Sequence, residues 1–320
     1  MDPSVPHEQS LLLGRVRRAW PGVGAAARRL AGVLALAMEL AKLRVVSLLL
    51  LTSLGGAFLA SAGRPSASRL ALLLVLGTLS AGGASAMNQF LEREPDRAMK
   101  RTRRRPLPSG RVSHPEWVLR LALAAVIGAS LAALVLSPWL AVFLSAGALI
   151  YVGVYTLWLK PRSVLNIVVG GAAGSCAVLA GSAAVGRPFH PAAVALALLV
   201  FLWTPAHFWA LAMTMQSDYR AAGVPMLPAR APNPTSARWI AVHVAAAVVA
   251  ALVLAVDPSL GWIYFLPVAA ASLAVCILTV RLLRSPSPQR AMRVFLTSNL
   301  FLAVVVGAVI AATAGRGTVL

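Results

Sequence analysis

The chain has 320 residues, of which 59% are hydrophobic and 12% are charged. Soluble proteins carry about 25% charged residues, so the composition excludes a soluble protein, and it also excludes a collagen-like, a disulfide-stapled or a disordered chain. The net charge of +20 comes from 29 basic and nine acidic residues. Such an excess is found in nucleic-acid-binding proteins and in basic cytoplasmic loops, and the apolar composition favours the loops.

Apolar runs long enough to cross a bilayer follow one another along the chain. The third and fourth runs are separated only by Ser137 and Pro138, and we count two helices there because the combined run is too long for one crossing. The sequence therefore predicts an all-α, polytopic membrane protein with about nine transmembrane helices, at 45–62, 70–91, 118–136, 138–156, 164–185, 191–215, 237–256, 260–280 and 294–314.

These helices form a predicted transmembrane domain over residues 42–315. The polar, Arg-rich residues 1–41 are predicted to be a cytoplasmic tail, and residues 316–320 a short C-terminal tail. Arg17 and Arg18 raise the alternative of a twin-arginine signal, but no short apolar core with a cleavage site follows them. An amphipathic interfacial helix could form over residues 24–41.

The distribution of Lys and Arg predicts the orientation. With the N-terminus in the cytoplasm, 25 of the 29 basic residues lie in the tail and the inner loops. The four that fall outside are Arg64, Arg69, Arg187 and Arg316. Because cytoplasmic loops are enriched in Lys and Arg, we expect a multi-pass protein of the inner or plasma membrane with its N-terminus inside and its C-terminus outside.

Acidic residues are few, and three of them crowd together at the cytoplasmic end of the second predicted helix: Glu92, Glu94 and Asp96. Asn88, Glu92 and Asp96 are spaced i, i+4, i+8, so on a helix they share one face. Hard oxygen ligands at a membrane surface suit Mg²⁺, which binds carboxylates together with substrate phosphates. The spacing alone leaves open a solvated charged loop. Pro95 removes a backbone donor and predicts a kink or a helix end near Glu94.

Basic and aromatic residues surround this cluster in the predicted topology. The run over residues 100–105 could anchor the loop, contact lipid headgroups or bind phosphate. Tyr155 and Lys160 end the fourth predicted helix at the same surface, where they could donate to a diphosphate, although an aromatic belt explains the tyrosine equally well. Asn166 could join two helices or line a cavity.

The sixth predicted helix carries two further candidates. Asp218 stands at its cytoplasmic end, on the same side as the first acidic cluster, and the alternative is a surface residue at a helix end. His207 lies within the helix, where polar side chains are costly and are candidates for function. It could bond to a neighbouring helix, or serve as an axial ligand or acid–base group near a large acceptor. His243 is interpreted as structural.

These segments resemble the protoheme IX farnesyltransferase family, a branch of the UbiA-type intramembrane prenyltransferases. The likeness extends over residues 40–315 and is most specific at the His-Phe-Trp and Asp-Tyr…Gly-Val-Pro-Met-Leu segments. The matching segments are Asn88…Glu92-Arg-Glu…Asp96 with Met99-Lys-Arg-Thr and Arg105-Pro-Leu-Pro-Ser-Gly-Arg-Val, Tyr155-Thr-Leu-Trp-Leu-Lys160, Asn166-Ile-Val-Val-Gly-Gly-Ala-Ala-Gly174, Pro205-Ala-His-Phe-Trp-Ala-Leu211 and Asp218-Tyr…Ala-Gly-Val-Pro-Met-Leu-Pro228.

The resemblance implies nine helices around a central cavity that opens to the cytoplasm and laterally to lipid. It implies a Mg²⁺-dependent transfer of the farnesyl group of farnesyl diphosphate to a vinyl group of heme b, giving heme O and diphosphate. The implied partners are these substrates, membrane lipid, and heme A synthase or terminal-oxidase assembly proteins, but no nucleic acid. The implied catalytic and metal-binding residues are Asn88, Glu92, Asp96 and Asp218, and the implied substrate-binding residues are Arg97, Arg101, Tyr155, Lys160, His207 and Tyr219.

The chain departs from the family's pattern in both acidic motifs. Glu92 replaces a frequent aspartate but keeps a carboxylate, and Pro95 replaces an aliphatic residue. Ser217 and Ala222 stand where the second motif often has further acids, which places more of the metal binding on Asp218 and leaves a second metal ion open. Two alternatives remain: a sister enzyme that prenylates an aromatic acid or quinone precursor, and a transporter or assembly scaffold without catalysis.

Overall fold

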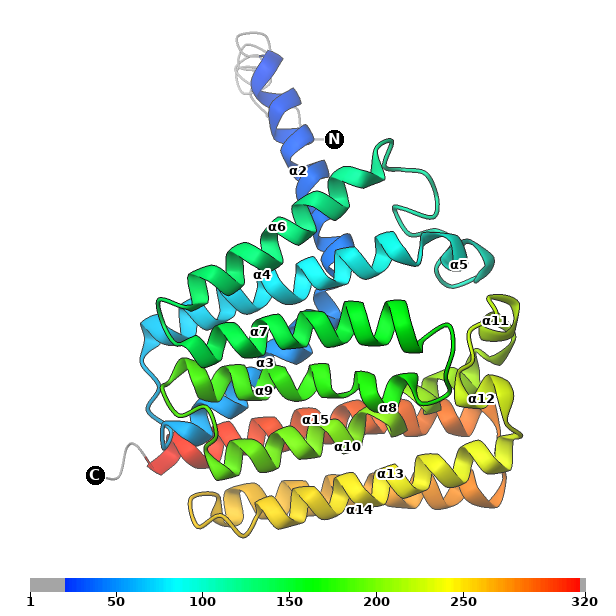
Figure 1. Cartoon of the computed structure of the whole chain (residues 1–320). Helices are drawn as coiled ribbons and strands as arrows, with labels where there is room; N and C mark the ends of the chain where they lie inside the picture. The colour runs from blue at the N-terminus through cyan, green and yellow to red at the C-terminus, as the bar shows by residue number, and fades with distance from the viewer. Residues whose placement is uncertain (1–20, 317–320) are drawn as a thin grey trace, which may run out of the picture.

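The structure, a computed structural model, describes residues 21–316, and every regular element in that range is a helix (Figure 1). Nine helical segments of this range are long and apolar enough to cross a membrane, which confirms the predicted all-α, multi-pass fold. The nine are α3 (Leu43–Ala60), α4 (Ala67–Leu91), α6 (Pro115–Ala133), α7 continued by η1 (Pro138–Leu149 and Ile150–Leu159), α8 with α9 (Asn166–Gly170 and Ala172–Ala184), α10 (Pro191–Thr214), α13 (Asn233–Leu254), α14 (Gly261–Arg284) and α15 (Pro288–Arg316).

Four further helices lie outside the spans: α2 (Pro21–Ala41), α5 (Arg93–Ala98), α11 (Gln216–Ala221) and α12 (Leu227–Arg230). A helix over 24–41 was one of the possibilities for the predicted tail, and α2 occupies this stretch with exposed apolar side chains such as Leu30 and Leu34. Residues 1–20 of the predicted tail, including Arg17 and Arg18, and residues 317–320 lie outside the described residues.

Prolines mark four helix starts, of which two, at 138 and 191, were predicted at the same residue and two, at 115 and 288, were predicted a few residues later. Pro115, Pro138, Pro191 and Pro288 are the first residues of α6, α7, α10 and α15. Proline suits the first helical position, because its fixed φ is helical and the N–H that it lacks would have no intrahelical partner there. Pro138 therefore separates α6 from α7, as predicted.

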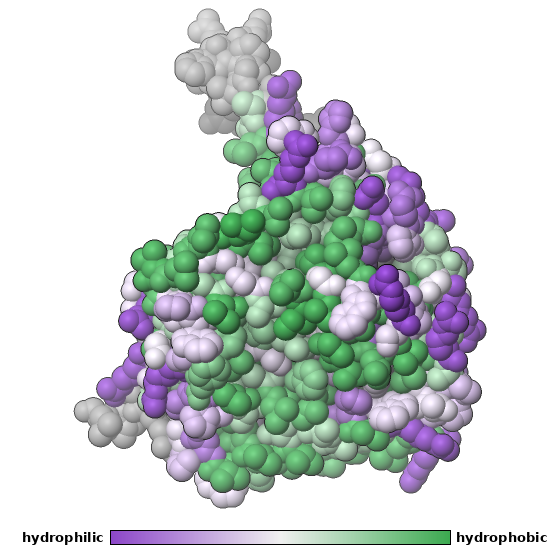
Figure 2. All heavy atoms as spheres, in the orientation of Figure 1, coloured by the Kyte–Doolittle hydropathy of each residue, from purple (hydrophilic) through white to green (hydrophobic). Residues whose placement is uncertain are grey.

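The spanning helices lie side by side, from α6 and α4 at one edge to α13 and α14 at the other (Figure 1). The chain brings distant segments together, since α3 packs against α9 and α15, and α10 packs against α9, α13 and α15. Figure 2 shows an apolar band across the visible face and hydrophilic residues gathered towards the ends of the helices. This distribution suits a protein whose sides face lipid.

Glycines allow α3 and α9 to approach until their backbones touch. A Cβ at Gly181 of α9 would overlap the carbonyl oxygen of Ser53 in α3, and a Cβ at Gly56 of α3 would overlap that of Val178 in α9. Small residues at such crossings are how membrane helices gain contact, because lipid tails are as apolar as the helices themselves.

Replacing Gly181 by Ala is therefore expected to destabilise the protein by about 1–3 kcal/mol or more, because the overlap is with backbone that cannot rotate away. Gly128→Ala is the matched control: Gly128 lies in α6, and its Cβ would meet nothing within 4 Å. That change is expected to leave stability unchanged or to raise it by up to about 1 kcal/mol. Thermal unfolding of both variants in detergent measures the difference, and equal melting temperatures would contradict the close contact.

Candidate active site

A cavity of about 460 Å³ lies between the helices. Its walls come from α3, α4, α7 with η1, α8 with α9, α10 and α15, whereas α6, α13 and α14 contribute none of its lining residues. The charged side chains lie at the end of the helices that carries α5, and the remaining walls are mainly apolar. The polar lining residues at that end include Lys42, Asn88, Glu92, Asp96, Arg101, Arg105 and Lys160.

The end of α4 positions the three predicted oxygen donors. The helix stops at Leu91, Glu92 adopts φ −95 and ψ 8, and α5 begins at the next residue. Pro95 has no N–H to donate to the carbonyl of Leu91, so the break that was expected near Glu94 falls at Glu92. Because Asp96 N still donates to Glu92 O at 2.8 Å, Asp96 stays on the cavity side, only 4% exposed.

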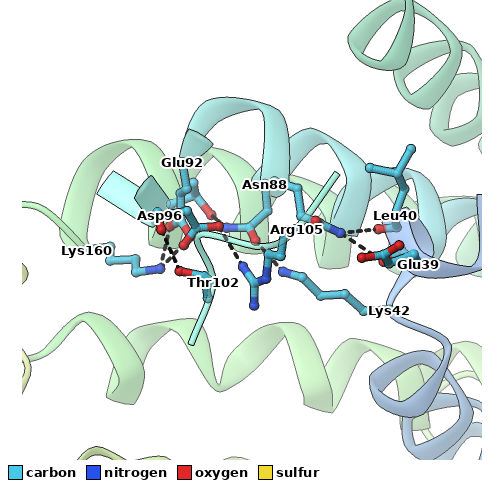
Figure 3. A network of polar contacts seen from close by, with 11 residues as sticks. Glu39, Leu40, Lys42, Asn88, Glu92, Asp96, Thr102, Arg105 and Lys160 are labelled. Carbon is cyan, nitrogen blue, oxygen red and sulfur yellow. Dashed lines mark hydrogen bonds and ion pairs between the residues drawn. The ribbon is translucent and has the colours of Figure 1, made fainter. Parts of the chain in front are cut away.

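Each of these three oxygen-bearing side chains accepts a hydrogen bond from one basic side chain (Figure 3). Lys42 Nζ donates to Asn88 Oδ1 at 2.7 Å, and Arg105 Nη1 donates to Asp96 Oδ2 at 2.7 Å. Lys160 Nζ donates to Glu92 Oε2 at 2.6 Å; it is also 2.6 Å from Oε1, but outside hydrogen-bonding geometry. Three oxygen-bearing side chains and three basic side chains are thus paired one to one at the charged end of the cavity.

The wall next to α4 is a π-helix. Residues Ile150–Leu159 form η1, in which hydrogen bonds join residues five apart, and Lys160 N continues the pattern by donating to Tyr155 O at 2.8 Å. In a regular α-helix, Tyr151 and Lys160 would point to opposite sides. The wider π turn brings them to the same cavity, consistent with the frequent occurrence of π segments at functional sites.

Two tyrosines of η1 stack in parallel, Tyr151 on Tyr155, with ring centroids 5.8 Å apart. Thr156 ties this wall to α4, since its hydroxyl accepts from Asn88 Nδ2 at 3.1 Å and donates to Tyr151 O at 2.8 Å. A Cβ at Gly170 of α8 would meet the Tyr155 ring at 2.8 Å, so a glycine is needed there to leave room for the ring.

Burial and charge act on the two lysines in different ways. Burial lowers the pKa of Lys42 to about 7, and the charges of Arg105 and Lys160 act in the same direction, although Glu92 and Asp96 oppose them. Burial also lowers the pKa of Lys160, but the charge and hydrogen bond of Glu92 more than offset this effect and hold the pKa above its usual value. Lys160 is thus a fixed positive charge.

The second acidic motif reaches the same end of the molecule from α11. Asp218 Oδ2 accepts a long hydrogen bond of 3.4 Å from the backbone N–H of Arg101. Asp218 is partly exposed and does not line the cavity, whereas the neighbouring Tyr219 is buried and does. Arg101 itself lines the exposed rim.

The donors present fit a hard cation in chemistry. Asn88, Glu92 and Asp96 offer an amide and two carboxylate oxygens in one cavity, as Mg²⁺ requires when phosphates and waters complete its shell. Within the part of the chain that the structure describes, no three His, Cys, Asp or Glu side chains converge on one point. Binding of a metal ion here would therefore need the amide oxygen of Asn88 and oxygens from a bound phosphate group. It would also need the three basic side chains to release the oxygens to which they are now bonded.

Arg97 is placed away from this group. Its Nε donates to Pro108 O at 3.1 Å and its Nη1 to Glu94 Oε2 at 2.8 Å, and it does not line the cavity. The arginine that bonds to Asp96 is instead Arg105, which lies eight residues after Arg97. Sequence reasoning missed Lys42 and Arg105 as site residues; the signal for Lys42 was its position, with Arg44, at the start of an apolar run.

His207 lies on the cavity wall in α10, buried and 7% exposed. Its ring stacks on Trp203 with centroids 4.3 Å apart and lies 4.5 Å from Phe295 of α15. Its Nδ1 is 3.0 Å from Ser298 Oγ of α15, which is the interhelical bond that was one of the two alternatives for this residue. Because the Ser298 hydroxyl donates its one proton to Phe295 O at 2.8 Å, Nδ1 must be the donor to Ser298. This assigns the tautomer with a free lone pair on Nε2.

The other two polar candidates lie outside the cavity lining. Asn166 is fully buried, and neither atom of its amide group has a hydrogen-bond partner. His243 of α13 bonds to the Trp239 carbonyl at 3.0 Å and meets the edge of Trp209. The bond within its own helix suits the structural interpretation of His243.

The UbiA prenyltransferase family matches residues 49–314 of the chain. The chain belongs to this family. This UbiA-family chain is 40% identical to the protoheme IX farnesyltransferase of Metallosphaera sedula, over 83% of this chain and 92% of that protein. It is 38% identical to that of Gloeobacter violaceus, over 92% and 94% of the two chains, and 42% identical to that of Frankia alni, over 85% and 97%.

Solved structures share the fold of this UbiA-family chain. A digeranylgeranylglyceryl phosphate synthase superimposes with a TM-score of 0.74 at 18% identity, covering 88% of this chain and 99% of that one. A UbiA homolog from Archaeoglobus fulgidus bound to GPP and Mg²⁺ superimposes with a TM-score of 0.59 at 14% identity, covering 86% and 99%. At such low identities the comparison establishes the arrangement of helices.

Proposed function

We propose that this chain transfers the farnesyl group of farnesyl diphosphate to a vinyl group of heme b, giving heme O and diphosphate. The relatives at 38–42% identity carry the name protoheme IX farnesyltransferase. The single observation that carries the proposal is the cavity itself. One end combines oxygen donors with basic side chains, and the same cavity is bounded by a buried histidine whose Nε2 lone pair is free.

The charged end suits a prenyl diphosphate. Asn88, Glu92 and Asp96 would hold Mg²⁺, as the bound Mg²⁺ of the Archaeoglobus fulgidus homolog supports, and Asp218 is the nearby carboxylate of the second motif. The metal would supply Lewis-acid stabilisation of the leaving diphosphate.

Basic side chains at this end supply the remaining stabilisation of the leaving group. Arg101, Arg105 and Lys160 lie where they can donate to phosphate oxygens as the allylic C–O bond breaks and negative charge develops. Arg97 has no part in this proposal, because it is bonded to Pro108 and Glu94 outside the cavity.

The apolar walls protect the farnesyl cation that remains. Water would capture an allylic cation, and a cavity bounded by aliphatic and aromatic side chains excludes it. The stacked rings of Tyr151 and Tyr155 border the charged end and offer π faces to positive charge. Tyr219 closes the cavity from α11.

His207 is proposed to position heme b by ligation of its iron through Nε2. The bond from Nδ1 to Ser298 fixes the ring and raises the basicity of the opposite nitrogen, as partners of metal-bound histidines do. A heme vinyl carbon attacks the farnesyl cation and forms the new C–C bond. Water then adds to the resulting heme-side cation and releases a proton, which leaves a hydroxyethylfarnesyl group.

We further propose that the charged end faces the cytoplasm. It lies at the same end of the helices as α5 and α11, which belong to inner loops in the orientation that places 25 of the 29 basic residues inside. Both substrates would then reach the site from the cytoplasm or from the membrane.

The test is an assay of the purified protein with heme b, farnesyl diphosphate and Mg²⁺, read by mass spectrometry. We expect heme O in the presence of Mg²⁺ and a loss of at least about 100-fold in rate when a chelator removes the metal. Supplying an aromatic acid or a quinone precursor instead of heme separates this activity from that of a sister enzyme. Prenylation of those acceptors with no product from heme would refute the proposal.

A further inference from the structure

The serine and threonine side chains that line the cavity are bonded within the protein, with one exception. Thr52, Ser53 and Thr204 each donate to a backbone carbonyl oxygen of their own helix at 2.7–2.8 Å. Ser80 donates to a carbonyl oxygen of α7 at 3.3 Å. The hydroxyl group of Ser85 in α4 is buried and has no hydrogen-bond partner among the described residues.

A buried hydroxyl group without a partner is uncommon, because it has lost its bonds to water without a replacement. Among the buried side-chain atoms of residues 21–316 that lack a partner, only Ser85 Oγ and Glu92 Oε1 belong to side chains that line the cavity. Glu92 is part of the charged end and is paired with Lys160. Such exceptions indicate a bound partner or a role in chemistry, and for Ser85 the cavity is the place from which a partner can come.

Ser85 lies where the charged end of the cavity meets its apolar walls. It precedes Asn88 by three residues and Glu92 by seven, and seven residues are two helical turns, so Ser85 and Glu92 share a face of α4. The rise of the helix puts Ser85 about 10 Å from Glu92 along α4. Beyond it, α4 contributes small side chains such as Ala81 to the lining. A diphosphate at the charged end would therefore have the first carbon of its prenyl chain near Ser85.

His207 lies at a similar depth on another wall of the cavity. Ser85 is six residues before the end of α4, and His207 is seven residues before the end of α10. Both helices run towards the end of the molecule that carries α5 and α11 (Figure 1). At 1.5 Å per residue, both side chains are about 10 Å from these helix ends. A heme bound at His207 and a prenyl chain that begins near Ser85 would meet at this level.

The proposed reaction needs a water molecule at this level. Formation of the new C–C bond leaves a cation on the heme-side carbon. This cation either takes up water, or loses a proton from the neighbouring carbon and becomes a C=C bond. A water molecule among apolar walls is held only where polar groups bond to it. A serine hydroxyl group can accept a hydrogen bond from water, which leaves a lone pair of the water oxygen free to attack.

We propose that Ser85 binds the water molecule that adds to the heme-side cation, and thereby determines that the product carries a hydroxyl group. This inference rests on the proposed function. The Ser85 hydroxyl and an oxygen of the released diphosphate each accept a hydrogen bond from the water. The water oxygen forms the C–O bond with the cationic carbon, and its extra proton passes to the diphosphate. Without this water, the diphosphate takes a proton from the neighbouring carbon, and the product has a C=C bond in place of the hydroxyl group.

The test separates the products of the purified protein by chromatography and weighs each by mass spectrometry, since the alkene product is lighter than heme O by one water. Ser85→Ala is expected to raise the ratio of alkene to heme O by at least about tenfold, the effect of one hydrogen bond. Release of diphosphate is expected to stay within about threefold, because cleavage of farnesyl diphosphate precedes the addition of water. Ser85→Thr keeps a hydroxyl group and is expected to restore the wild-type ratio.

Thr78→Val is the matched control, because Thr78 donates to Leu74 O in the same helix and does not line the cavity. It is expected to keep the wild-type ratio. Ser85→Val, which fills the place of the hydroxyl group with methyl groups, is expected to shift the ratio as Ser85→Ala does. A wild-type ratio in both Ser85→Ala and Ser85→Val would refute the role of Ser85, whatever their rates. If the wild-type protein forms neither product from heme b, the proposed function fails together with the inference.

Discussion

Replacing Asp96 by Asn is expected to lower the rate of farnesyl transfer by about 100-fold or more, with the fold retained. The change removes a carboxylate charge from the proposed Mg²⁺ site, yet the amide oxygen of asparagine can still accept from Arg105, which now holds Asp96 at 2.7 Å. The rate is measured by mass spectrometry of heme O, and the melting temperature in detergent checks the fold.

Glu94→Gln is the matched control for this change. Glu94 lies two residues earlier in α5, but its side chain is 63% exposed and pairs with Arg97 at the surface. Exposed pairs contribute little to stability, so the control is expected to keep both its rate and its melting temperature. Loss of activity in Glu94→Gln alone would place the metal on the outer face of α5 and overturn the assignment of Asp96.

The number and type of the helices could be predicted because bilayer physics leaves few choices. A long run of apolar residues is predicted to be a helix in lipid, because a helix bonds every backbone N–H and C=O within the segment where no water is available. Pro138 alone was enough to divide the third and fourth spans. The predicted starts were slightly late where a proline or polar first turn precedes the apolar run, as at Asn233 of α13. A hydropathy pattern marks only the apolar part of a helix, so it misses a polar first turn.

The placement of Asn88, Glu92 and Asp96 on one cavity could also be predicted, since a spacing of four residues keeps side chains on one helix face. Their partners could not. Lys42, Arg105 and Lys160 reach these oxygens from three different segments, and only the packing of the helices brings those segments together. Charge alone gave no means to prefer Arg105, in the basic run 100–105, over Arg97, which precedes that run.

The irregular backbone segments at the site could not be predicted from the sequence, for a different reason. The sequence of η1 is an ordinary apolar run ending in Lys160, and nothing in it distinguishes a π-helix from an α-helix. Likewise, the backbone at Lys42, between α2 and α3, is left-handed, which lysine does not favour. Both features depend on tertiary contacts that override local preference, and both deliver a lysine to the cavity.

Replacing His207 by Ala is expected to weaken heme b binding by at least about tenfold and to lower farnesyl transfer by about 100-fold. Affinity for farnesyl S-thiolodiphosphate, an unreactive analogue of the substrate, is expected to stay within about twofold, because the proposed function assigns the diphosphate to other residues. Absorption titration with heme b measures the first effect through the band that reports axial ligation. His207→Gln serves as a second variant, since it fills more of the space between Trp203 and Phe295.

His243→Ala is the matched control, because His243 contacts Trp209 and the carbonyl of Trp239 outside the cavity. It is expected to bind heme b with the wild-type spectrum. Added imidazole is expected to restore the ligated spectrum in His207→Ala, since a small ligand can occupy the vacated volume, whereas a merely structural loss would not respond. Wild-type heme titration and wild-type transfer in both His207 variants would show that heme is held without this histidine, and the acceptor would then be positioned by the cavity walls alone.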